Sequence, residues 1–163
     1  MGKLQEQLID AVVVGNLEGV KRLVDRGADI HAGDNSALRW AAGQGHLDIV
    51  EFLVGKGANI PAQDEHALRW AANNGHLEVV KYLVEQGADI HALENRSLRW
   101  AAEEGQIEVV QFLVERGCPI DIAKEYGTDA VQDFCKAYEL QKMLDNKLEK
   151  SAKIKVNKTK LKI

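Results

Sequence analysis

Hydrophobic and polar positions recur along this chain with a period of 30 residues. The string LRWAA begins at Leu38, Leu68 and Leu98, and residues 37–66 and 67–96 are identical at 16 of 30 positions. A fixed period of this size is the signature of repeat architectures, in which each unit buries its apolar face against its neighbours. The sequence therefore predicts an elongated array of stacked units.

Each unit contains two stretches with the spacing of an amphipathic helix. In the third unit, apolar residues lie three or four positions apart over 68–74 and again over 77–86. They are Leu68, Ala71, Ala72, Leu77, Val80, Leu83 and Val84. Gly75 and Gly87 follow the two stretches and are predicted to end the helices. The segment that leads to the next unit, residues 88–96, is expected to be extended.

The repeat spacing also predicts the domain boundaries. We expect an all-α solenoid over residues 1–141, closed by a capping helix that begins near residue 128 and ends near 150. A basic tail follows over residues 142–163. The four helix-turn-helix repeats are placed at about 8–37, 38–67, 68–97 and 98–127.

The units resemble the ankyrin repeat. The resemblance rests on GHLDIVEFLVGKGANI (45–60) and GHLEVVKYLVEQGADIHA (75–92), and it covers about residues 5–127. The usual ankyrin period is about 33 residues, with a TPLH box at the first helix. Here three residues are missing, and SALR, HALR and RSLR replace the box. The resemblance implies a solenoid with short extended fingers, similar to the ankyrin arrays of giant amoeba-infecting DNA viruses.

Three tryptophans, Trp40, Trp70 and Trp100, occupy one position of successive units and form a tryptophan row. The resemblance implies that this position faces a concave groove that binds partner proteins. The groove residues expected beside the row are Gln44, Asn73, Asn74, Glu103 and Glu104. Exposed tryptophan is enriched in binding hot spots. The alternative interpretation is structural, because indoles on helices about 8–10 Å apart can stack on each other.

Charged residues also recur at fixed positions. Arg39, Arg69 and Arg99 stand where the family usually has histidine, so we expect them to connect adjacent repeats by bonding finger carboxylates or carbonyls. A basic stripe for an acidic partner is the alternative. The expected finger residues, which are also candidate partner contacts, are Asp34, Asp64, Glu65 and Glu94.

The net charge of −4 is unevenly distributed. Residues 142–163 contain eight lysines and two acidic residues, a charge of +6, and the rest of the chain carries −10. Nucleic-acid binding by the folded array is therefore not expected, since it requires a basic face. The tail is interpreted as a flexible segment, with a nuclear-import signal, an anionic-surface signal or a short edge strand as alternatives.

No chemical signature is found in the sequence. The histidines lack metal-ligand spacing, the glycines are spaced as helix terminators, and no Ser or Cys belongs to a recognisable catalytic motif. We expect no metal, no cofactor and no small-molecule substrate. The start MGKLQEQLID lacks the apolar core of a signal peptide, and Cys118 and Cys135 form no disulfide framework. A cytoplasmic protein with reduced thiols is expected.

These observations predict a monomeric, non-enzymatic scaffold that binds a protein partner through the groove and fingers. The alternative is an adaptor whose lysine-rich tail docks on nucleic acid or an anionic surface while the array recruits a client; the tail could also direct the protein to the nucleus. A regulator that covers the active site of an enzyme would have the same sequence features. The sequence does not name the partner.

Overall fold

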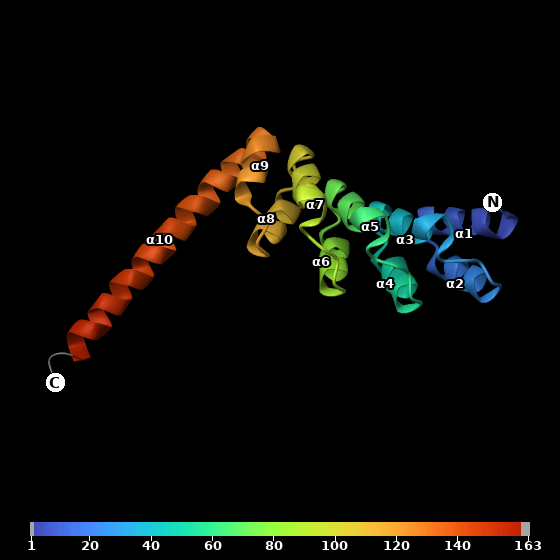
Figure 1. Cartoon of the computed structure of the whole chain (residues 1–163), viewed down its shortest axis with the longest axis horizontal. Coiled ribbons are helices and arrows are strands. Elements are labelled where there is room, and N and C mark those ends of the chain that lie inside the picture. Colours follow the sequence, from blue (N-terminus) through green and yellow to red (C-terminus); the bar gives the residue numbers. More distant parts are fainter. Residues whose placement is uncertain (1, 161–163) are drawn as a thin grey trace.

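The chain folds into a row of helical hairpins (Figure 1). The computed structural model describes the backbone of residues 2–160, and side chains there except at 62–64 and 154–160. Every regular element over this range is a helix. The helices are α1 (Lys3–Val13), α2 (Leu17–Asp25), α3 (Ala32–Gln44), α4 (Leu47–Gly55), α5 (Ala62–Asn73), α6 (Leu77–Glu85), α7 (Ala92–Glu103), α8 (Ile107–Glu115), α9 (Ile120–Tyr126) and α10 (Asp129–Lys160).

The helices form two layers. Helices α1, α3, α5, α7 and α9 lie side by side in one layer, and α2, α4, α6 and α8 form the second (Figure 1). Each helix contacts its hairpin partner and the equivalent helices of the neighbouring units. The all-α solenoid predicted from the sequence is confirmed.

The core consists of the same positions in every unit. Leu8, Leu38, Leu68 and Leu98 are almost fully buried, and the alanines that follow them let neighbouring helices of the first layer pack closely. The second layer contributes Val20, Val50, Val80, Val110, Leu53, Leu83 and Leu113. Because one hairpin could not enclose these side chains, each unit depends on its neighbours for burial.

Hydrogen bonds join successive hairpins at the turns between their two helices. A side chain just before the second helix donates to a carbonyl at the end of the first helix in the preceding unit: His46 Nε2 to Val13 O (3.2 Å), His76 Nε2 to Gly43 O (3.0 Å) and Gln106 Nε2 to Asn73 O (3.1 Å). The turn glycines Gly15, Gly45 and Gly75 have positive φ, and these side chains lie directly against them. His46 and His76 thus have the structural role expected from the sequence.

The segments expected to be extended are compact instead. A turn is followed by residues in the left-handed region, at Gly33, Asp34, Asn35, Glu65, Leu93, Glu94 and Asn95, with φ between 50° and 63°. Non-glycine residues avoid this region unless their surroundings hold them there. Side chains from these turns provide such contacts, because Asn35 Oδ1 accepts from Asn59 N (2.8 Å) and Glu65 Oε1 accepts from Asp89 N (3.0 Å) in the next unit.

The C-terminal end differs from the prediction in two ways. Helix α9 was not predicted; it packs on α7 and stacks Tyr126 under the Arg99 guanidinium, 4.0 Å from the ring centre. Helix α10 continues to Lys160, so residues 151–160 are neither a strand nor an irregular tail. No glycine or proline occurs after Gly127 to stop the helix. Residues 161–163 lie outside the described range.

Replacement of Leu83 by alanine is expected to lower the free energy of unfolding by about 2–5 kcal/mol, because the side chain is fully buried between units and its loss leaves a cavity. Leu17→Ala in the first unit should cost less, since Leu17 is only partly buried. Urea unfolding of both variants measures the difference. Equal losses would contradict the view that interior units depend on two neighbours and the first unit on one.

Candidate functional site

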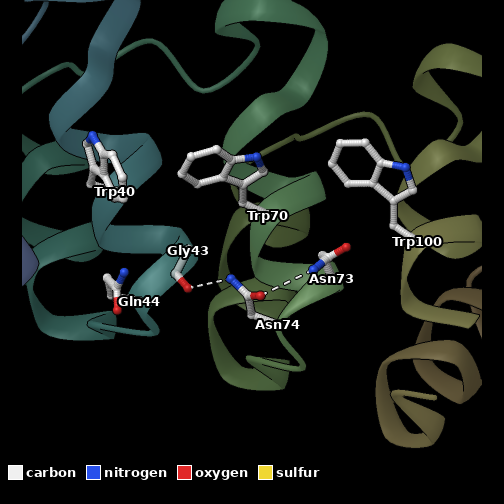
Figure 2. Close-up of a pocket in the computed structure, with 7 residues that line it drawn as sticks. All are labelled: Trp40, Gly43, Gln44, Trp70, Asn73, Asn74 and Trp100. Carbon is white, nitrogen blue, oxygen red and sulfur yellow. Dashed lines mark hydrogen bonds between the residues drawn. The ribbon is translucent and has the colours of Figure 1, made fainter. Parts of the chain in front are cut away.

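The first-layer helices carry a groove of about 390 Å³ on their exposed side (Figure 2). It is lined by Trp40, Gly43, Gln44, Trp70, Asn73, Asn74 and Trp100, which come from α3, α5 and α7. Six of these seven are residues that the sequence predicted for the groove. Glu103 and Glu104 do not line it, although both are exposed at the end of α7 next to it. Glu103 accepts a hydrogen bond from Arg99 Nε (2.8 Å).

Tryptophans of the row pack against neighbouring residues and still expose part of their rings to solvent. Trp40 and Trp70 meet edge to face, with ring centres 5.3 Å apart and planes at 79°. Trp70 also lies against Gly43, where an added Cβ would come within 2.8 Å of its ring. Trp40 nevertheless remains 37% exposed. These contacts support the structural interpretation of the row, and the exposed ring surface leaves partner binding as a prediction.

Trp100 is held differently from the other two tryptophans. The Arg69 guanidinium of the preceding unit lies over its ring, 5.1 Å from the centre. In Figure 2 its indole stands beside that of Trp70, and both project from their helices towards the same side. Cation–π contacts of this kind stabilise the ring without covering it entirely.

Amide side chains line the floor of the groove. Asn74 Nδ2 donates to Gly43 O (2.7 Å), and Asn73 Nδ2 donates to Asn74 Oδ1 (3.2 Å), as the dashed lines in Figure 2 show. Gln44 is exposed at the corresponding position of the preceding unit. Side-chain amides can both donate and accept hydrogen bonds, so they suit the backbone of a bound polypeptide.

The repeat sequence matches a known protein family. The family model for ankyrin repeats (3 copies) matches residues 8–94 and, in a second match, residues 64–124. The chain belongs to the ankyrin-repeat family. No curated protein matches it. Ankyrin repeats generally mediate protein–protein interactions, and the family is typically non-enzymatic.

One of the three arginines at this repeat position connects two ankyrin units, as expected. Arg69 reaches Trp100 of the next unit, whereas Arg99 reaches Tyr126 of α9 in the last unit. Arg39 donates through Nη2 to Gly33 O (2.8 Å), a carbonyl of the turn at the start of its own helix α3. The expectation that the arginines bond turn carbonyls is therefore met at Arg39. Arg69 and Arg99 instead lie against aromatic rings, and Arg99 also pairs with the Glu103 carboxylate.

The turns that replace the ankyrin fingers contribute less surface than expected. Asp34 and Glu94 are exposed, as predicted, whereas the side chain of Asp64 lies outside the described residues. Glu65 was predicted to be an accessible contact, and this is wrong because it is 4% exposed. Its left-handed backbone turns the side chain inwards, towards Asp89 N of the next unit.

Burial changes the proton affinity of Glu65. Desolvation raises the pKa of its carboxyl; the hydrogen bond from Asp89 N lowers it, and the Asp89 charge raises it further. Its second oxygen, Oε2, is buried without a hydrogen-bond partner. His66, which the sequence did not single out, lies edge to face with Trp70 at 5.0 Å. Burial lowers the pKa of His66, and the charges of Arg69 and Arg39 lower it further.

The described residues contain no arrangement suited to metal chemistry or to a reactive thiol. Within residues 2–160, no three His, Cys, Asp or Glu side chains that could hold a metal ion come together among those described. Cys118 and Cys135 are both buried, and burial raises the pKa of the Cys118 thiol to about 11. None of the described helices is long and apolar enough to cross a membrane.

Glu65→Gln is expected to stabilise the array at neutral pH and to have little effect below the ordinary carboxyl pKa. Since the folded pKa of Glu65 is raised, its contribution is fully present when it is protonated and is lost as pH rises through the folded value. Glutamine keeps an acceptor for Asp89 N but carries no charge. Urea unfolding between pH 4 and neutrality measures this growing difference, with the exposed Glu94→Gln as control. A constant offset across this range would show that the Glu65 charge is not responsible.

Proposed function

We propose that this ankyrin array is a non-enzymatic scaffold that binds a protein partner through the groove of the tryptophan row. The observation that carries the proposal is the groove itself: three indoles and a set of amides brought together from three successive units. Aromatic side chains provide large contact areas, and amides provide hydrogen bonds. Together they form the usual centre of a protein-binding surface.

The rigidity of the groove supports this role. Trp70 packs against Trp40 and Gly43, Trp100 is covered in part by Arg69, and Asn74 is bonded to the preceding unit. Side chains that are already ordered lose little entropy when a partner binds. The turns contribute less, because Glu65 is buried and, of the candidates there whose side chains are described, Asp34 and Glu94 are exposed. A cytoplasmic location is part of the same proposal.

Trp70→Ala is the central test, because Trp70 lies in the middle of the groove. Affinity capture from native lysate with wild-type and variant baits identifies a partner, whose dissociation constant is then measured by calorimetry. We expect a loss of about 2 kcal/mol or more, as for a central hot spot, with the array still folded. An unchanged dissociation constant, after correction for the folded fraction, would contradict binding by the groove.

Two glycines provide a matched pair of variants for the same measurement. Gly43→Ala places a methyl group against the Trp70 ring and should displace it, so partner affinity should fall. Gly55→Ala, in open space at the end of α4, should leave affinity unchanged. The pair separates displacement of the indole from a general effect of glycine replacement.

A second candidate function is supported by the charge of +6 over residues 142–163. In this alternative the C-terminal half of α10 docks on nucleic acid or an anionic membrane while the array recruits a client. Deleting residues 147–163 should abolish binding to duplex DNA and to phosphatidylserine vesicles. Helical ellipticity should fall only by the removed segment, and the melting temperature should be unchanged because residues 147–153 are exposed. Binding that survives the deletion would reject this alternative.

A further inference from the structure

Helix α10 presents an apolar surface that remains exposed among the residues the structure describes. Its first turns close the array, with Val131 and Cys135 fully buried, but from Leu140 onwards it leads away from the units (Figure 1). All described side chains from 140 to 153 are exposed. Four of them are large and apolar: Leu140 (58% exposed), Met143 (58%), Leu144 (46%) and Leu148 (68%).

These four residues lie on one side of the helix. Their spacings of three and four residues place them within one stripe, which we name the leucine stripe. Met143 still lines a hollow beside Val114 and Ile120 of the last unit, but the side chains from Leu144 to Lys153 are all exposed. Isolated helices are marginally stable in water. Burial of the leucine stripe against a partner would therefore stabilise both the apolar residues and the helix.

The chain cannot cover this stripe with its own groove. Helix α10 is continuous from Asp129 to Lys160, and no glycine or proline lies within it to allow a bend. Its anchored first turns direct the rest away from α3 and α5 (Figure 1). A segment so placed can reach a groove only on another molecule.

The groove and the projecting segment of α10 complement each other in apolar surface and in charge. The groove offers indoles and is followed at the α7 end by two exposed carboxylates, Glu103 and Glu104. The helix offers leucines and a methionine, and its sequence continues into five lysines over residues 153–162. The two parts of the chain also differ in net charge, at −10 for residues 1–141 and +6 for 142–163.

We propose that the leucine stripe of one molecule occupies the tryptophan groove of a second copy of this chain. From Leu140 to Leu148 the helix rises about 12 Å, comparable to the separation of about 8–10 Å between neighbouring packed helices. A stripe seated on Trp40 and Trp70 with its C-terminal end towards α7 places Lys150 and Lys153 on the side of Glu103 and Glu104. This contact is a helix-in-groove interaction, and it deepens the proposed function because it requires the groove to bind protein.

Lys147 favours the tryptophan groove over a lipid bilayer as the surface that covers the leucine stripe. It lies on the same side as Leu144 and Leu148, where it would oppose insertion among acyl chains but can interact with an indole face. Nucleic acid would use the lysines and leave the leucine stripe exposed. Pairing of two α10 helices would bring two segments of charge +6 together.

The interaction joins unlike surfaces and is therefore heterologous. Each molecule that donates its helix keeps its own groove open, so copies can add in a chain. The proposal replaces the monomer expected from the sequence with a concentration-dependent assembly. A partner that occupies the groove would compete with the second copy.

A mixing experiment with two variants of the full chain tests the proposal. Leu144→Glu with Leu148→Glu removes the stripe at exposed positions, and Trp70→Ala removes the centre of the groove. Sedimentation velocity is run on the wild type, on each variant and on their equimolar mixture, from micromolar to near-millimolar protein. Circular dichroism confirms that each variant is folded, and Lys142→Gln, outside the stripe, is the control.

The expected result is assembly of the wild type that weakens at high salt, monomers for each variant alone, and a 1:1 complex in the mixture. The mixed complex forms because one variant keeps the helix and the other keeps the groove. A monomeric wild type, a monomeric mixture, or assembly by either variant alone would overturn the proposal. So would phosphatidylserine vesicle binding that depends on Leu144 and Leu148 without self-association.

The second-copy contact can be tested separately from binding of a partner protein by the groove. The Leu144→Glu, Leu148→Glu protein retains the groove, so its affinity for a captured partner can be measured in the absence of self-association. Partner binding without assembly would reject the second-copy contact and leave the scaffold function in place.

Discussion

The structure depends on one constraint: a single hairpin of this length cannot bury its own apolar face. Leu68 and Leu83 are completely buried only because units stand on both sides of them. The period of 30 residues places equivalent leucines, valines and alanines at matching heights, so the core continues from one unit to the next. Equivalent hydrogen bonds, such as that from His76 to Gly43 O, then join successive hairpins.

The missing residues of the ankyrin period are accommodated by an unusual turn. Residues 33–35 and 93–95 adopt left-handed angles, which shortens the connection between hairpins and leaves no projecting finger. The side chain at the third position of the turn serves the next unit, through Asn35 in one case and Glu65 in another. In the last unit Pro119 stands where Asn59 and Asp89 supply the N–H, so it offers no donor to Asn95. The turns therefore project less than the extended fingers expected from the sequence.

Periodicity made the repeat, the buried positions and most of the groove predictable from the sequence. It gave Trp40, Trp70 and Trp100 a common position, and stacking of the units did bring them into one groove. Periodicity could not predict the left-handed turns, because Glu65, Leu93 and Glu94 are not residues that favour that region. It also could not predict that Glu65 would be buried, since this follows from the turn. The length of α10 was missed because the lysine-rich segment after residue 150 was interpreted as a flexible tail, with a short edge strand as an alternative.

The groove shows that identical residues in a repeat array need not have identical roles. Trp70 packs closely because Gly43 leaves room for its ring, whereas the equivalent position before Trp100 is Asn73. A larger residue there leaves less space for the next indole, which instead lies beneath Arg69. The chain thus keeps one core in every unit and varies the residues that support the tryptophan row. This repeat position changes from glycine to asparagine within the groove, at Gly43 and Asn73, and becomes glutamate just beyond it, at Glu103. Trp40, Gly43 and Gln44 line the α3 end of the groove without charge, whereas the exposed carboxylates of Glu103 and Glu104 lie beyond its α7 end. This difference in charge gives the groove a direction.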